Sequence, residues 1–315
     1  MTTPRTLVAI VGATASGKTA AAIEVARRLP VEVISADSRQ LRRQMRIGTA
    51  APTEDELAAV PHHLVGVLEP DEPWTVADFL ARANAAIEEI WARGRLPLLV
   101  GGTGQYVWAL LEGWQVPPAS ANPALRAELE ALATQPGGPQ ALRARLESGD
   151  PASAARIAPQ NLRRIIRAIE IVEGTGAPVA PLERRAPGFE WRIVGLDWTR
   201  EELHARADVR AAAMYAGGLI EETRALIERF GPALPALATI GYAQAARVVL
   251  GEWDAAAALA RTKIETHRLI RMQATWFRRD DPRIRWVPGA DLEAAAAAVE
   301  RAFAGAGAAA ALEAP

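Results

Sequence analysis

The chain has 315 residues, a formal net charge of −1 and no cysteine. This length accommodates one large or two domains, the charge balance excludes an overall basic field for nucleic acid, and the lack of cysteine excludes disulfides, thiolate zinc sites and cysteine nucleophiles. The sequence shows no signal peptide and no apolar stretch of about 18 residues. We therefore expect a cytoplasmic protein without a membrane span.

The first predicted strand, residues 5–11, leads directly into the pattern G-x-x-x-x-G-K-T of a phosphate-binding loop. Glycine lets the backbone turn successive N–H groups toward one anion, and a helix predicted over 17–29 adds its positive N-terminal end. Lys18 supplies a point charge, and the Thr19 hydroxyl is placed to help bind Mg²⁺. The alternative is a glycine-rich turn without a ligand. The loop consists of Gly12, Ala13, Thr14, Ala15, Ser16, Gly17, Lys18 and Thr19.

Two further predicted strands end in polar groups. A strand over 31–35 ends near Asp37, and a strand over 96–100, which follows a helix over 76–93, ends in a Gly-Gly-Thr-Gly sequence that contains Thr103. In open α/β sheets, ligands bind beyond the carboxyl ends of the strands, so the phosphate loop, Asp37 and Thr103 should meet in one crevice. From position alone, Asp37 is equally suited to cap a turn, and Thr103 to satisfy its own glycine-rich turn.

Strands that alternate with helices predict a P-loop NTPase-like α/β fold, with a parallel sheet flanked by helices. The pattern changes near Pro117, after which we expect helices only, until a strand over 193–197 returns the chain to the sheet. Beyond that strand, helices dominate from 199 to 278, and an alanine-rich helix with a frayed end is expected over 290–315. The predicted domains are an α/β core with a helical C-terminal part, residues 1–116 plus 189–315, and an all-helical insertion, residues 117–188.

Arginines cluster at 39–46, at 163–167 and from 268 to 279, and each cluster is either a solvated face or a phosphate-binding surface. In the second cluster, interleaved isoleucines predict a helix with one packed side and one basic side. The adjacent pair His62 and His63 is reminiscent of a metal site. Neighbouring residues do not share a face of a helix or strand, however, so a packed loop is the better prediction.

A phosphate loop alone does not identify the phosphate compound. A kinase or hydrolase usually carries a second carboxylate for Mg²⁺ at a strand end, and only Asp37 and Asp197 follow apolar runs in this way. The base-reading motif of GTPases, Asn-Lys-x-Asp, is absent, because neither Lys18 nor Lys263 has that context. The phosphate compound therefore stays open at this point.

Taken together, the segments resemble the tRNA dimethylallyltransferase family over roughly residues 5–288. The family moves the dimethylallyl group from dimethylallyl diphosphate to N6 of the adenosine just 3′ of a tRNA anticodon, and diphosphate leaves. The resemblance implies a bacterial-type enzyme that binds the anticodon stem-loop and holds a prenyl diphosphate, rather than ATP, in the loop with Mg²⁺. Besides the loop, it rests on Asp37-Ser38-Arg39-Gln40, Gly101-Gly102-Thr103-Gly104, Arg164-Ile165-Ile166-Arg167 and Thr275-Trp276-Phe277-Arg278.

The resemblance also implies roles for single residues. Asp37 matches the family's catalytic aspartate, which serves the adenine amine as a base, and Thr103 matches the threonine beside the reacting centre. Lys18 would stabilise the charge that grows on the leaving diphosphate, and the target base must leave its stack to enter the pocket. The tRNA-binding residues implied are Asp37, Ser38, Arg39, Gln40, Thr103, Arg126, Arg163, Arg164, Ile165, Ile166 and Arg167.

The chain departs from the family pattern at five positions. Arg42 and Arg268 are candidates to replace the tRNA-backbone contacts that these departures remove. The departures are Ala51 for a lysine, Arg42 for an aromatic residue, Asn161 for an aspartate, and His267 and Met272 for arginines.

Two other functions are compatible with the phosphate loop. The first is an ATP-dependent small-molecule or nucleotide kinase, which has no need for a helical insertion with an arginine face. The second is a non-catalytic RNA-binding protein, against which the presence of both Asp37 and Thr103 counts. No feature demands a dimer, so we expect a monomer.

Overall fold

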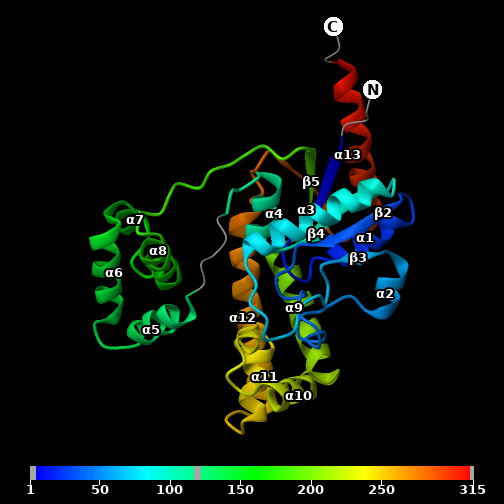
Figure 1. The fold of residues 1–315 in the computed structure, drawn as a ribbon. Coiled ribbons are helices and arrows are strands. Elements are labelled where there is room, and N and C mark those ends of the chain that lie inside the picture. Colours follow the sequence, from blue (N-terminus) through cyan, green and yellow to red (C-terminus); the bar gives the residue numbers. More distant parts are fainter. Residues whose placement is uncertain (1–4, 117–121, 313–315) are drawn as a thin grey trace. The chain divides into compact units, whose positions relative to one another are not determined.

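The computed structural model describes residues 5–116 and 122–312. The expected transition at Pro117 and the last residues of the C-terminal tail, 313–315, lie outside this part of the chain. The structure divides into two compact units, Met1–Gly113 with Arg185–Pro315 and, separately, Trp114–Arg184. The first unit contains the sheet, and the second consists of the helices α5 to α8 (Figure 1).

The sheet of the first unit has six strands in the order β3-β2-β4-β1-β5-β6, and every neighbouring pair is parallel. This order confirms the predicted P-loop NTPase-like α/β fold. The strands β1 and β2 are buried along their whole length, as expected of a sheet covered on both faces. The strands are β1 (Thr6–Val11), β2 (Val31–Ser35), β3 (His62–His63), β4 (Leu96–Gly101), β5 (Glu190–Asp197) and β6 (Ile284–Pro288).

Helices cover both faces of this sheet. One face packs against α1 (Lys18–Ala26) and α13 (Leu292–Leu312), whose small side chains join the strand residues in a single core cluster. The helices α3 (Val76–Ala92) and α4 (Gly104–Leu111) contact β4 but contribute nothing to that cluster, so they cover the other face. A short helix, α2 (Glu54–Ala59), precedes β3.

A helical extension follows β5 in the same unit. Figure 1 shows α9 and α12 running side by side away from the sheet, with α10 and α11 at their far end. A separate core cluster that includes Met45, Leu226 and Tyr242 holds this end together. The helices are α9 (Arg200–Ala216), α10 (Leu219–Phe230), a 3-10 turn (Pro235–Ala238), α11 (Tyr242–Val249) and α12 (Ala255–Trp276).

Three short elements differ from the sequence-based expectation. His62 and His63 form the edge strand β3 rather than a packed loop, and β6 and α2 were not predicted. A two-residue strand has no periodicity to detect, and β3 exists because its backbone pairs with β2. The described residues contain no group of three or more His, Cys, Asp or Glu side chains that could hold a metal ion.

The second unit is a small bundle with its own core. Three of its helices are capped by the side chains that begin them: Asn122 starts α5, Asp150 starts α7 and Asn161 starts α8. Leucines and isoleucines from α5, α6 and α8 form the core. The helices are α5 (Pro123–Ala133), α6 (Gly138–Gly149), α7 (Pro151–Arg156) and α8 (Leu162–Thr175). Within the described part of the chain, no helix is long and apolar enough to cross a bilayer.

Candidate active site

The phosphate loop lies between β1 and the N-terminus of α1. Gly17 caps the helix with a φ of 89°, a conformation that favours glycine. Ala15 also has a positive φ, 65°, which is unusual for a residue with a side chain. The Ser16 hydroxyl is buried and has no hydrogen-bond partner among the described residues. A strained loop with an unsatisfied hydroxyl is typical of a ligand-binding site.

Lys18 points back over this loop. Its Nζ donates to the carbonyl oxygens of Gly12, at 3.2 Å, and Ala13, at 2.8 Å. Burial lowers the pKa of Lys18 to about 8; Asp37 opposes this shift and Arg210 adds to it. The ammonium is thus held over the loop by carbonyls and is available to an anion that binds there.

The structure joins the loops that follow β2 and β4. The Thr103 hydroxyl accepts a hydrogen bond from the Ser38 backbone N–H, at 3.0 Å, and donates to the Ser38 hydroxyl, at 3.3 Å. Thr103 therefore ties the Asp37 loop to its own loop instead of satisfying its own turn. Asp37 does stabilise a turn, because its Oδ1 accepts from the Arg39 N–H at 2.9 Å. Among the described residues no hydrogen bond reaches its second carboxylate oxygen.

Two cavities adjoin at this point. One, of about 270 Å³, is lined by Asp37, Thr103 and Trp276 together with apolar side chains of α9 and α12. The other, of about 1140 Å³, is lined by the phosphate loop from Thr14 to Ala20 and again by Asp37. Thr14 and Asp37 line both cavities. This arrangement confirms that the three strand-end groups converge on one crevice.

Two arginines of α9 reach the phosphate loop and were missed by the sequence analysis. The Arg210 guanidinium donates to the Thr14 hydroxyl, and Arg206 Nε donates to the Ala15 carbonyl at 2.8 Å. Arg206 also stacks on the ring of Trp198, 4.3 Å from its centroid. The two arginines are four residues apart and so share one helix face. That spacing is visible in the sequence, but their distance of about 190 positions from the loop hides the contact.

The residues present are compatible with Mg²⁺ bound to a diphosphate. The Thr19 side chain lines the same cavity as the phosphate loop and Asp37. The protein supplies few oxygen ligands there, and Mg²⁺ characteristically takes one or two protein oxygens together with phosphate oxygens and water. Asp197, the other strand-end carboxylate, forms an ion pair with Arg279 at 2.5 Å.

In the helical unit, α8 has one packed and one basic side, as predicted. Arg163 and Arg164 are exposed and form no ion pair among the described residues. Arg167 and Arg126 both pair with Glu170, whose side chain is 4% exposed.

Two of the predicted tRNA-binding residues need correction. The side chains of Ile165 and Ile166 are 1% and 4% exposed and belong to the core of the helical unit. They support the helix and are not available to contact RNA.

Several polar side chains of the loop after β2 form hydrogen bonds within the protein. Gln40 donates to the Ala50 carbonyl at 2.9 Å, and Arg42 donates to three carbonyls, those of Glu69, Pro70 and Glu72. Arg42 therefore braces its own loop.

Another departure, His267, and the candidate Arg268 also have partners within the protein. His267 stacks on His204 and bonds to Asp208 at 2.8 Å, while Arg268 pairs with Glu265 at 2.7 Å. These contacts lie within the helical extension, between α9 and α12 or along α12 itself. Arg268 remains exposed beside this ion pair.

Comparison with known proteins identifies the family. A family model described as IPP transferase matches residues 40–280, and one described as isopentenyl transferase matches residues 5–63. The tRNA dimethylallyltransferase of Chloroflexus aurantiacus is 48% identical over 284 residues, which cover 90% of this chain and 96% of that protein. The tRNA dimethylallyltransferase of Anaeromyxobacter dehalogenans is 47% identical over 298 residues, covering 94% and 99%.

Solved structures support the same family assignment. The crystal structure of a full-length tRNA isopentenylpyrophosphate transferase from Bacillus halodurans is 38% identical, with a TM-score of 0.70, and 96% of each chain is covered. A eukaryotic dimethylallyltransferase shares the fold with a TM-score of 0.73 at 24% identity, covering 92% of this chain and 75% of that one. The chain therefore belongs to the IPP transferase family.

Proposed function

We propose that this chain transfers the dimethylallyl group of dimethylallyl diphosphate to N6 of the adenosine 3′-adjacent to the anticodon of a tRNA. The products are N6-dimethylallyladenosine and diphosphate. The observation that carries the proposal is the crevice in which the phosphate loop, Asp37 and Thr103 meet, in a chain that belongs to this family. We place the reaction in the cytoplasm and expect the chain to act as a monomer.

In the proposed reaction, the adenine N6 attacks the first carbon of the prenyl group. The N–C bond forms as the C–O bond to diphosphate breaks, and the electron pair of that bond leaves with the diphosphate. Lys18, the amides of the phosphate loop and Arg210 stabilise the growing negative charge. Asp37 accepts the proton that N6 loses, because Asp37 lines both the cavity of the phosphate loop and the adjoining cavity, in which we place the adenine.

Thr19 would hold Mg²⁺ against the bound diphosphate, and that ion would add positive charge beside the leaving group. Thr103 holds the Ser38 loop through its hydroxyl, which fixes Asp37 next to the cavity. The arginines of α8 would bind phosphates of the anticodon stem-loop, because Arg163 and Arg164 are exposed and carry uncompensated charge.

Mass spectrometry of tRNA nucleosides tests the proposal directly. Incubation with dimethylallyl diphosphate and unmodified tRNA should yield N6-dimethylallyladenosine, and substitution of ATP for the prenyl diphosphate should yield no phosphoryl transfer. Phosphorylation of a small molecule by ATP, with no prenylated adenosine, would favour the kinase alternative instead.

The variant Asp37→Asn distinguishes the proposed role of Asp37 as a general base from its role in stabilising the turn. The amide oxygen can still accept from the Arg39 N–H, as Oδ1 does now, but the side chain no longer accepts a proton. Turnover should fall by about 10²–10⁴, the range for a lost general base, with tRNA affinity retained in a filter-binding assay. Unchanged turnover would remove Asp37 from the role of base.

A further inference from the structure

The last turns of α12 place an amide side chain between two loops of the site. Gln273 Oε1 accepts the backbone N–H of Thr14 in the phosphate loop, at 2.8 Å. Its Nε2 donates to the carbonyl of Gly102, in the loop that carries Thr103, at 2.9 Å. One side chain thus bridges the diphosphate loop and the loop beside the reacting centre.

The chain accommodates this bridge with two glycines. A Cβ at Gly102 would clash with Gln273 Nε2, and a Cβ at Gly104 would clash with the ring of Trp276. The end of α12 therefore lies directly on the Gly-Gly-Thr-Gly loop. This close approach explains why the loop needs glycine at positions where its φ angles do not require it.

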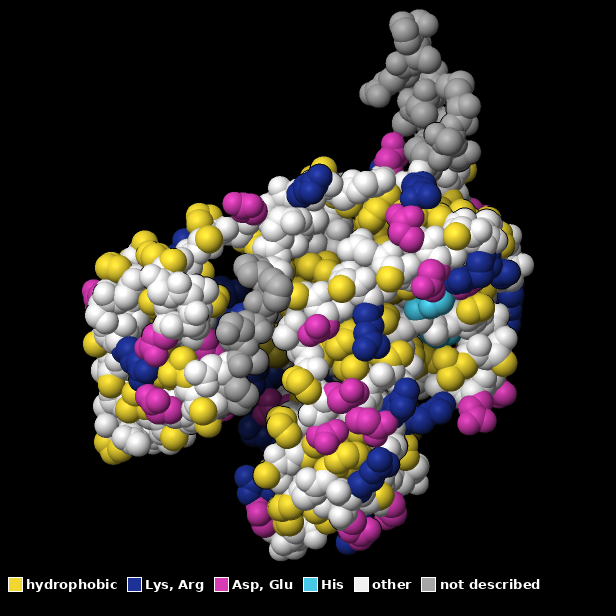
Figure 2. Space-filling model, in the orientation of Figure 1, with side chains coloured by type: hydrophobic (Ala, Val, Ile, Leu, Met, Phe, Trp, Pro, Cys, Tyr) yellow, Lys and Arg dark blue, Asp and Glu magenta, His cyan; other side chains and the backbone are white. Residues whose placement is uncertain are grey.

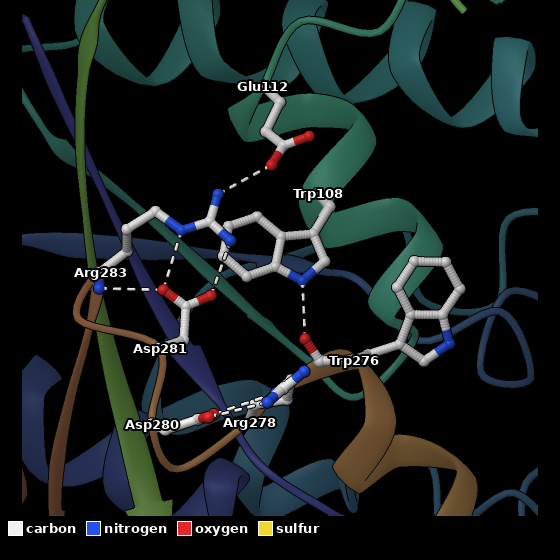
Figure 3. Close-up of polar contacts among 7 residues, drawn as sticks. All are labelled: Trp108, Glu112, Trp276, Arg278, Asp280, Asp281 and Arg283. Atoms are coloured by element: carbon white, nitrogen blue, oxygen red, sulfur yellow. Dashed lines mark hydrogen bonds and ion pairs between the residues drawn. The ribbon is translucent and has the colours of Figure 1, made fainter.

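The end of α12 is itself fixed from α4. The carbonyl of Trp276 accepts the Trp108 indole N–H at 3.0 Å (Figure 3). Arg283 lies 4.1 Å from the centroid of the Trp108 ring, and its guanidinium pairs with Glu112 and Asp281. Because the end of α12 is held in this way, Gln273 can keep the two loops at a fixed distance from each other.

We infer that Gln273 is a positioning residue for prenyl transfer, which sets the spacing between the diphosphate cradle and the loop that orients Asp37 and Thr103. The inference rests on the proposed function. Displacement at carbon needs the reacting atoms about 3–3.5 Å apart, and a misplacement of 1 Å can cost roughly 10²-fold in rate. The amide of Gln273 can accept from Thr14 and donate to Gly102 together without carrying a charge.

Two variants at this position test the inference. Gln273→Met keeps the length and removes both hydrogen bonds, so kcat should fall by roughly 10–100-fold, while the KM for tRNA and the thermal midpoint stay near the wild-type values. Gln273→Glu keeps the acceptor but loses the donor and adds a negative charge beside the cradle. Its KM for dimethylallyl diphosphate should rise about tenfold or more at neutral pH, because the added carboxylate repels the negatively charged diphosphate in a desolvated site.

The pH profile of Gln273→Glu is the readout that a merely structural role would not move. A protonated carboxylic acid donates through one oxygen and accepts through the other, as the amide does. The ratio of variant to wild-type kcat should therefore recover as the pH falls, because kcat reports the substrate complex, in which burial and the charge of the bound diphosphate favour the protonated carboxyl group. Gln135→Glu, the same change at an exposed position of the helical unit, should show neither the loss nor the recovery.

The outcomes separate this inference from the proposed function. If the wild-type chain forms no prenylated adenosine, the proposed function fails. If the wild-type chain is active and Gln273→Met retains full kcat, or if Gln273→Glu shows no recovery toward acid pH, the positioning role is wrong. A large fall in the thermal midpoint of Gln273→Met, with activity lost only in proportion to the unfolded fraction, would also overturn it.

Discussion

At the scale of single residues, the site depends on charges whose strength is set by burial. Lys18 is held against two carbonyls and beside Arg210, and the pKa of its ammonium falls to about 8. Arg210 is buried as well, which lowers its pKa, although an arginine remains charged at any working pH. The lysine is therefore the cation of the cradle that titrates within reach of ordinary assay conditions.

This leads to a pH prediction for the free protein. Because the charged form of Lys18 is lost as the pH rises through about 8, kcat/KM for dimethylallyl diphosphate should be high below that value and fall above it. In Lys18→Ala the profile should lie lower and lack this descent. The measurement is kcat/KM between pH 6 and 10, which reports groups of the free enzyme. A wild-type profile that stays level to pH 10 would contradict the assignment.

At the scale of elements, the catalytic geometry depends on how closely the ends of β2 and β4 approach. A Cβ at Gly101 would clash with the carbonyl oxygen of Ala36, and the Thr103 N–H donates to that same oxygen at 3.1 Å. The two loops that carry Asp37 and Thr103 therefore leave the sheet in contact. Their alignment is a property of the strand ends and not only of the side chains.

Gly101→Ala should disturb this alignment. The added methyl group meets backbone, which cannot move aside as a flexible side chain can, so we expect destabilisation of about 1–3 kcal/mol and a loss of kcat beyond the loss of folded protein. Chemical denaturation and turnover measure the two effects. Gly188→Ala is the matched control, because a Cβ there has no neighbour within 4 Å. Equal behaviour of the two variants would count against a close approach of the strand ends.

At the scale of the whole molecule, charge is mixed rather than segregated. Figure 2 shows Lys and Arg side chains interspersed with Asp and Glu over the face that it presents, in keeping with a net charge of −1. Binding of a polyanion must then come from local groups of arginines that have no internal partner. Arg163 and Arg164 on α8 meet this condition, whereas Arg126 and Arg167 share Glu170.

The salt dependence of tRNA binding tests this view. Arg164→Ala should weaken binding and reduce the slope of log K against log salt by about 0.7–0.9, the value for one phosphate contact. Arg167→Ala should flatten the slope less, because Arg167 already pairs with Glu170. Arg192→Ala, near the N-terminal end of β5 and away from the carboxyl ends of the strands, removes the same charge and should leave the slope unchanged. A wild-type slope in both α8 variants would exclude these phosphate contacts.

Most of the fold could be predicted from the sequence, because local sequence patterns identify its main elements. Apolar runs such as β1 and β4 are fully buried strands, and the phosphate loop, Asp37 and Thr103 follow strand ends, where a parallel sheet gathers its ligands. The family was also recognisable from short motifs in order. The strands β3 and β6 were missed, because edge strands are short and owe their existence to pairing with a neighbour rather than to their own periodicity.

What the sequence alone determined is the phosphate loop, the class of fold and the family. The tertiary structure decided which distant side chains complete the site: Arg206 and Arg210 from α9, and Gln273 from α12. It also decided which arginines are free and which are used internally, as Arg42 is. The reason is physical. Local patterns fix backbone conformation and burial, whereas a hydrogen bond between residues 259 positions apart exists only once the packing of helices on the sheet has brought its two atoms together.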